Sequence, residues 1–226
     1  MRALVFSHTI MGGGQGFCVT IGNEVDGGVY QWRLRVRPNQ SLLYTHFGIQ
    51  GLVLRRQLRP GSIIEIEHPF QVAAEDRRIT HPEDVVMAQP PRMEIVDPQG
   101  GVEHMSRLAE RLAFGSVAEL FPGMFADNQK WYRPGREPNA RAVGYVRVQA
   151  VDFFLDGDNL RAWLTDEAGN RFNIKVVGID LVNREVNPQN IYLARLSLAN
   201  PFAGQYWAHT AHPSRCYLML SHVIGR

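Results

Sequence analysis

Short β-prone runs separated by turn residues occupy both ends of the chain, and they limit the possible folds more than any other feature. In the first third these runs are residues 2–6, 16–21, 29–36 and 62–67. In the last third they are residues 143–155, 160–165, 171–177, 191–198 and 216–224. Runs of this length between Gly, Pro, Asn and Asp turns are typical of strands joined by hairpins. Both ends of the chain are therefore expected to be β-sheet.

The middle of the chain has a different pattern. Apolar residues between 104 and 120 recur at helical spacing, and Gly115 with Ser116 is expected to divide this stretch into two short helices. Residues 121–138 are rich in Pro, Gly and polar side chains, which is typical of a linker. A small helical middle therefore separates two β-rich parts.

About five short strands in each part fit a five-stranded Greek-key barrel of the OB type better than one large sandwich. The expected fold class is mainly β, with a small helical middle and two OB-like barrels. The expected boundaries are residues 1–100 for the N-terminal barrel, 101–140 for the helical segment and linker, and 141–226 for the C-terminal barrel.

Composition excludes several classes of protein. A hydrophobic fraction of 45% with 20% charged residues is that of a folded globular chain. No apolar run approaches the roughly 18 residues needed to cross a bilayer, and the first residues do not form a secretory signal. Cys18 and Cys216 lie too far apart for a secreted disulfide framework. We expect a cytoplasmic protein that has no membrane partner.

Arginine dominates the basic residues, because only Lys130 and Lys175 among the 24 Lys and Arg residues are lysine. The arginine side chain is planar and bidentate, and it suits phosphate groups and nucleic-acid bases. A GC-rich genome that favours arginine codons is the alternative explanation. Arginine content therefore points to a binding site only where arginines cluster.

The first candidate binding strand spans residues 29–38. Regular alternation places Tyr30 and Trp32 on one face, and the other face carries three arginines, Arg33, Arg35 and Arg37. OB barrels bind single strands by stacking bases on aromatic rings, at about 1–3 kcal/mol per base, while cations contact the phosphates. The alternative is that the two aromatic residues face the core and the arginines are merely solvated. In both cases the arginine face is the one expected in solvent.

A matching surface is expected on the second barrel. Its candidate residues are Tyr145, Arg147, Arg161, Trp163 and Arg171. The alternative is a core aromatic residue with a charged outer face.

No catalytic motif, cofactor motif or metal motif is evident. His209, His212 and Cys216 have a spacing that could place three ligands near one ion, with Cys18 or His222 as a fourth. Structural zinc sites normally show tighter ligand pairs, so no metal is expected. No cofactor is expected, and no pair of residues resembles an acid and a base that act on a substrate.

Motifs along nearly the whole chain resemble one family. They are Ala3-Leu4-Val5-Phe6, Met11-Gly12-Gly13-Gly14, Phe17-Cys18-Val19, residues 32–38, His81-Pro82-Glu83-Asp84, residues 170–174, residues 196–202 and Cys216-Tyr217-Leu218. Their order resembles that of the dual OB-containing domain family of prokaryotic proteins. The resemblance implies two OB folds and a presumed nucleic-acid or ligand-binding role, without an established enzymatic activity.

The sequence thus favours a non-catalytic binding protein that engages single-stranded or structured nucleic acid through arginine–phosphate contacts and aromatic stacking. One alternative is a protein-interaction or scaffold subunit of a larger prokaryotic assembly, in which residues 104–139 contact a protein partner. Another is a protein that binds a small nucleotide-like ligand in a barrel groove.

Overall fold

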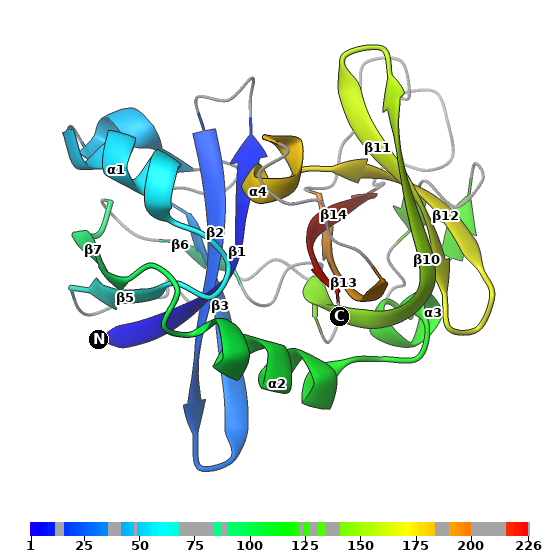
Figure 1. Cartoon of the computed structure of the whole chain (residues 1–226), viewed down its shortest axis with the longest axis horizontal. Coiled ribbons are helices and arrows are strands. Elements are labelled where there is room, and N and C mark those ends of the chain that lie inside the picture. Colours follow the sequence, from blue (N-terminus) through cyan, green and yellow to red (C-terminus); the bar gives the residue numbers. More distant parts are fainter. Residues whose placement is uncertain are drawn as a thin grey trace.

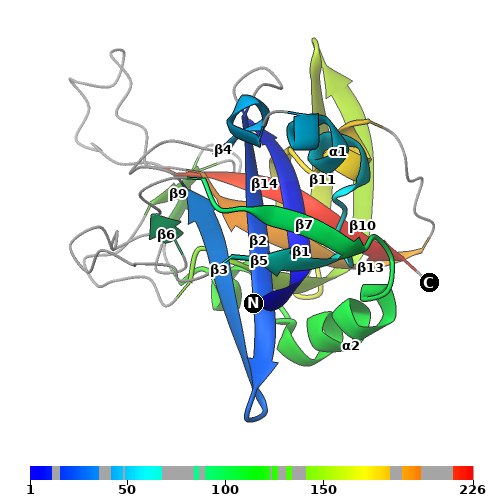
Figure 2. The ribbon, with the colours of Figure 1, turned by 90° about the vertical axis from the view of Figure 1, so that its left-hand side faces the viewer.

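A computed structural model provides the fold of the chain (Figures 1 and 2). It describes residues 1–11, 16–35, 42–47, 49–67, 84–86, 90–122, 124–126, 131–133, 141–183, 190–199 and 216–225. These residues form two β-sheets with short helices beside them, so the expectation of a mainly β chain with a small helical middle is confirmed.

The first sheet is built from the N-terminal part of the chain. Its strands are β1 (Arg2–Met11), β2 (Gly16–Val25), β3 (Gly28–Arg35), β4 (Leu42–Leu43), β5 (Ile63–Ile66), β6 (Asp84–Val86) and β7 (Met93–Asp97). The strand order is β6-β3-β2-β1-β5-β7, and β4 pairs with β2. Asp26 and Gly27 both have positive φ, of 51° and 77°. This conformation suits the two-residue hairpin turn that joins β2 to β3.

The second sheet closes into a barrel. Its strands are β8 (Met124–Ala126), β9 (Trp131–Arg133), β10 (Val143–Asp156), β11 (Asn159–Asp166), β12 (Arg171–Val176), β13 (Ile191–Leu198) and β14 (Cys216–Gly225). The order β12-β11-β10-β13-β14 is closed by parallel pairing of β12 with β14. A five-stranded Greek-key barrel with this order is OB-like. In the first sheet the order β3-β2-β1-β5-β7 repeats it.

In the described ranges the helices are few and short. They are the 3-10 turn η2 (Tyr44–Phe47), α1 (Ile49–Gln57), α2 (Val102–Leu112), α3 (Val117–Leu120) and α4 (Ile179–Val182). The break predicted at Gly115 and Ser116 separates α2 from α3, and the Ser116 hydroxyl accepts a hydrogen bond from the Glu119 amide at 3.2 Å. Residues 101–140 also contain β8 and β9, which join the second sheet through β14. No helix among the described residues is long and apolar enough to cross a membrane.

A third apolar cluster joins the two halves, in addition to one core inside each sheet. Its buried members are Leu4, Phe6, Met105, Leu108, Ala109, Tyr145, Leu193 and Ile224. They come from β1, α2, β10, β13 and β14, so the two sheets pack against each other with α2 beside both (Figure 1). We call this contact the seam. It determines which strand faces remain open to solvent.

Candidate functional site

The arginine face of β3 is covered by the second barrel. Arg33 is only 4% exposed, and its Nη1 donates to the Leu198 carbonyl on β13 at 3.1 Å. Gln31 lies on the same face of β3, and its Oε1 accepts a hydrogen bond from Arg195 Nη2 at 2.6 Å. The expectation that this face lies in solvent is therefore wrong for Arg33. Strand alternation separates two faces but does not reveal that another part of the chain covers one of them.

The other residues predicted on this strand are not gathered into one exposed surface. Tyr30 is 56% exposed near the β2–β3 turn, whereas Trp32 is half-buried against the first core. The side chain of Arg35 and the whole of Arg37 lie outside the described residues. In the described part of β3, only Tyr30 presents a large exposed aromatic side chain.

Tyr145 on β10 belongs to the seam, and Arg147 on the same strand contacts the end of α2 beside it. Tyr145 is fully buried, its ring lies edge-on to Phe6 with centroids 6.5 Å apart, and burial raises the pKa of its hydroxyl. Arg147 is exposed, and its guanidinium donates to the carbonyls of Ala113 at 3.2 Å and Glu110 at 3.4 Å. A cation at the C-terminal end of a helix stabilises it, so Arg147 holds α2 against β10.

The structure does bring together Arg161, Trp163 and Arg171. Arg161 and Trp163 alternate with the buried residues of β11 and therefore point away from the barrel core, as Arg171 does on β12. The Arg171 guanidinium carbon lies 4.5 Å from the centre of the Trp163 ring, a cation–π contact. Figure 1 shows β11 and β12 on the side of the barrel away from the first sheet.

Two more residues complete this surface, and neither was predicted from the sequence. Phe154 on β10 stacks beside Trp163, with ring centroids 6.1 Å apart and planes 20° from parallel. Lys175 on β12 is exposed and pairs across the ladder with Arg161. Both residues share the outward face of the same hairpins, so strict alternation from Trp163 would have identified them. We call Phe154, Arg161, Trp163, Arg171 and Lys175 the outer face.

The cations of the outer face differ in availability. Arg161 donates from Nε to Asn173 Oδ1 at 2.6 Å and lies 3.8 Å from Asp156, and only 14% of its side chain is exposed. Arg171 and Lys175 are exposed. Asp152 and Asp156 lie on β10, so negative charge borders one side of the face and positive charge follows β12 on the other.

Among the described residues of the first sheet, no corresponding surface is open. By strand order, β2 and β3 occupy the places that β11 and β12 occupy in the barrel. The outward side of β3 is covered at Arg33, and Phe6 lies against the position that a side chain at Gly22 would occupy. Of the two equivalent faces, the seam covers the first and leaves the second exposed.

Metal ligands do not cluster in the part of the chain that the structure describes. His209 and His212, two of the metal ligands considered from the sequence, lie outside the described residues. Cys216, the third, is fully buried. Burial raises the pKa of the Cys216 thiol to about 12, so this thiol stays protonated at neutral pH.

No protein-family model and no curated protein matches the chain. Solved structures similar to it include a murine DNA-binding protein bound to double-stranded DNA, with 9% identity, a TM-score of 0.33 and coverage of 100% of this chain and 95% of that one. A second structure concerns the "molecular basis for abrogation of activation of pro-inflammatory cytokines". It has 12% identity and a TM-score of 0.35, and the match covers 100% of this chain and 92% of that one. A third, the tetrameric p202 HIN2, has 10% identity, a TM-score of 0.30 and coverage of 99% and 91%. At these values the OB-like assignment rests on the sheet order alone, and the dual OB family remains a resemblance.

Proposed function

We propose that the chain binds single-stranded nucleic acid across the outer face of its C-terminal barrel. The observation that carries the proposal is the group formed by Phe154, Trp163 and Arg171 on neighbouring strands, in which the Phe154 ring is nearly parallel to the Trp163 ring and the Arg171 guanidinium lies over the Trp163 ring. OB barrels use the face of their second and third strands for oligonucleotides, and β11 and β12 hold those places.

The distribution of charge suggests an orientation for the strand. Bases stack on aromatic rings and on arginine planes, so they belong over Phe154, Trp163 and Arg171. Phosphates belong along β12, where Arg171 and Lys175 are exposed and the carboxylates of β10 are farthest away. Arg161 acts as a positioning residue, because its bond to Asn173 ties β11 to β12 beneath the bound strand.

The test is a fluorescence-anisotropy titration with labelled single-stranded DNA, single-stranded RNA and duplex at two salt concentrations. We expect Trp163→Ala to weaken single-strand binding about tenfold, in line with the loss of one stacked base. The double variant Arg171→Ala/Lys175→Ala should bind more weakly and lose part of the salt dependence, because fewer counterions are released.

The matched control removes two exposed arginines from elsewhere, Arg92→Ala/Arg107→Ala, with the same change in net charge. It should bind as the unaltered chain does. Equal losses in the two double variants would contradict a defined site. A triple change of Arg33, Arg35 and Arg37 is not a fair test, because Arg33 is buried in the seam.

Absence of binding to any nucleic acid at low salt would overturn the proposal and favour a protein partner. The surface to examine would then be α1, where Ile49, Leu52 and Val53 are 88%, 59% and 40% exposed. This surface differs from residues 104–139, the segment that the sequence alone suggested for a protein contact.

A further inference from the structure

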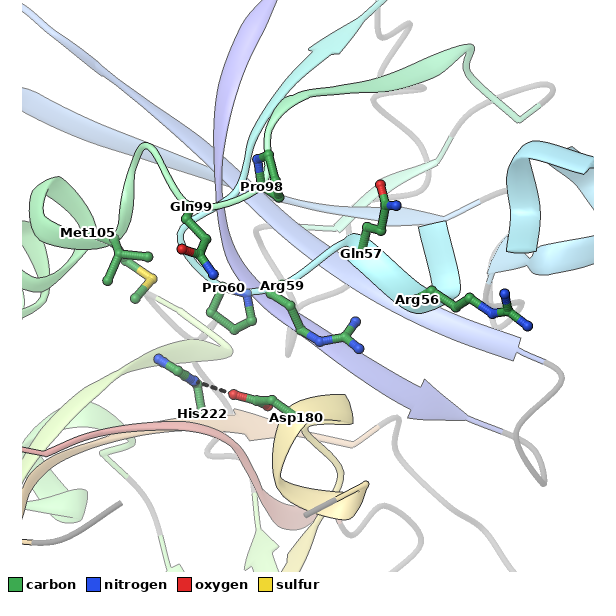
Figure 3. Close-up of a pocket in the computed structure, with 10 residues that line it drawn as sticks. Arg56, Gln57, Arg59, Pro60, Pro98, Gln99, Met105, Asp180 and His222 are labelled. Atoms are coloured by element: carbon green, nitrogen blue, oxygen red, sulfur yellow. Dashed lines mark hydrogen bonds and ion pairs between the residues drawn. The ribbon is translucent and has the colours of Figure 1, made fainter. Parts of the chain in front are cut away.

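A cavity of about 650 Å³ opens where the first sheet meets the second barrel, on a different part of the molecule from the outer face. Its lining includes Arg56 and Arg59 near the end of α1, Pro60, Met105 on α2, and Asp180 with His222 from the barrel (Figure 3). Pockets of about 300–1,000 Å³ are typical of small-molecule sites, which also occur preferentially between domains.

The floor of the cavity holds a histidine that a carboxylate orients. His222 Nδ1 donates to Asp180 Oδ2 at 3.0 Å, and Asp180 is only 4% exposed. In the neutral form of the imidazole, this bond leaves Nε2 as a hydrogen-bond acceptor. Nε2 has no hydrogen-bond partner among the described residues. A ligand donor can therefore reach a histidine that is already held in one orientation.

One end of the cavity is cationic. Arg59 Nη1 donates to the carbonyls of Arg55 at 3.2 Å and Leu58 at 2.9 Å, which fixes its guanidinium just after α1. Arg56 also lines the cavity and is exposed, and its guanidinium lies beyond that of Arg59, turned away from Asp180 and His222 (Figure 3). Two guanidinium groups at one end of a pocket are suited to the oxygens of a phosphate.

The opposite end is mostly apolar, with Met105 and Pro60 beside the amide of Gln99 (Figure 3). Figure 3 shows Met105 across the cavity from Arg56, with Pro60 above the His222 ring. Met105 is 2% exposed and packs in the seam cluster. Apolar walls of this kind accept a flat ring, while the arginines are placed to meet an anion.

We propose that this cavity binds a small phosphate ester that carries a planar ring and a hydrogen-bond donor, the chemistry of a nucleoside monophosphate. The phosphate lies at Arg56 and Arg59, the ring lies against Pro60 and Met105, and a hydroxyl or amino group donates to His222 Nε2. The site stands independently of nucleic-acid binding on the outer face, since the two share no residue.

The experiment is isothermal titration calorimetry of the full chain with the four common ribonucleoside 5′-monophosphates, their nucleosides and inorganic phosphate. We expect at least one monophosphate to bind, and its nucleoside and inorganic phosphate each to bind at least about tenfold more weakly. Absence of heat and of any thermal shift with all four at millimolar concentration would overturn the proposal. Inorganic phosphate that binds as tightly as the nucleotides would overturn it too.

Variants then locate the site. Arg56→Ala should weaken monophosphate binding about tenfold, since this exposed side chain has no other described bond. The matched control is Arg55→Ala, one residue earlier in α1, because Arg55 lies over the Tyr44 ring and does not line the cavity. His222→Gln should also weaken binding. Equal affinity for Arg56→Ala and Arg55→Ala would contradict the site, whereas Trp163→Ala should bind the monophosphate normally.

Discussion

At the scale of single residues, the seam shows how the chain buries charge. Arg195 is fully buried, with its guanidinium carbon 5.2 Å from the Phe6 ring centre and 4.9 Å from that of Tyr145. Two aromatic faces and the Gln31 amide oxygen offset part of the cost of removing a cation from water. Arg195 and Arg33 therefore contribute to the joining of the two halves, although arginines in a strand pattern usually indicate a solvent face.

Tyr44 makes the free energy of unfolding depend on pH in the alkaline range. Burial raises its pKa from 10.0 to about 12, although the nearby Arg55 and Arg59 oppose the shift, and its hydroxyl lies 2.8 Å from His8 Nε2. A pKa raised in the folded state means that this stabilisation is complete below pH 10 and is lost as pH rises toward 12. Between these values one such group lowers the free energy of unfolding by up to about 1.4 kcal/mol per pH unit.

Urea unfolding at several pH values between 9 and 12 measures this effect. Tyr44→Phe should show a shallower decline of unfolding free energy with pH than the unaltered chain. Parallel slopes for the two proteins would show that Tyr44 does not titrate differently in the folded state.

At the scale of elements, sequence patterns predicted those with strong local signals. The turn at residues 166–170 correctly placed the β11–β12 hairpin, where Gly169 has a φ of 86° and the Asn170 amide donates to Asp166 Oδ1 at 2.8 Å. The apolar spacing of α2 was equally clear. In contrast, α1 was missed, because it buries only Gly51 and Leu54 and exposes most of its apolar side chains, which leaves no helical period.

The β2–β3 hairpin depends on a glycine at the seam. A Cβ on Gly22 would lie 2.6 Å from Phe6 Cε2 and 2.6 Å from the Tyr30 carbonyl oxygen, and the latter is backbone that cannot rotate away. Gly22→Ala should therefore lower the free energy of unfolding by about 1–3 kcal/mol. Chemical denaturation of the matched variant Gly28→Ala provides the control, since a Cβ at Gly28 would lie no closer than 3.5 Å to any neighbour, the Val25 carbonyl oxygen being the nearest. Similar values for the two variants would contradict a tight contact at Gly22.

At the scale of the whole molecule, the candidate site depends on how the halves pack. Sequence alternation indicated Arg161, Trp163 and Arg171 on the barrel as well as Arg33 on β3. The local pattern alone does not distinguish a strand face that lies in solvent from one that the other half covers. Long-range packing does, since β13 covers Arg33 and nothing described covers Arg171. For the same reason the seam cavity was not predicted: Arg56 and His222 lie far apart in sequence and meet only when both halves are folded.

The shared apolar cluster implies that the two sheets unfold together. Phe6 on β1 is fully buried and packs in one cluster with the barrel residues Tyr145 and Leu193. Separation of the halves would therefore expose a continuous apolar surface on each. Differential scanning calorimetry should show one cooperative transition, and Phe6→Ala should lower its midpoint, with a cost of about 3–5 kcal/mol from the lost burial and the cavity left behind. Phe153→Ala is the control, because Phe153 is 38% exposed on β10 outside the cluster. Two transitions in the unaltered chain, only one of them shifted by Phe6→Ala, would show that the halves are stable independently.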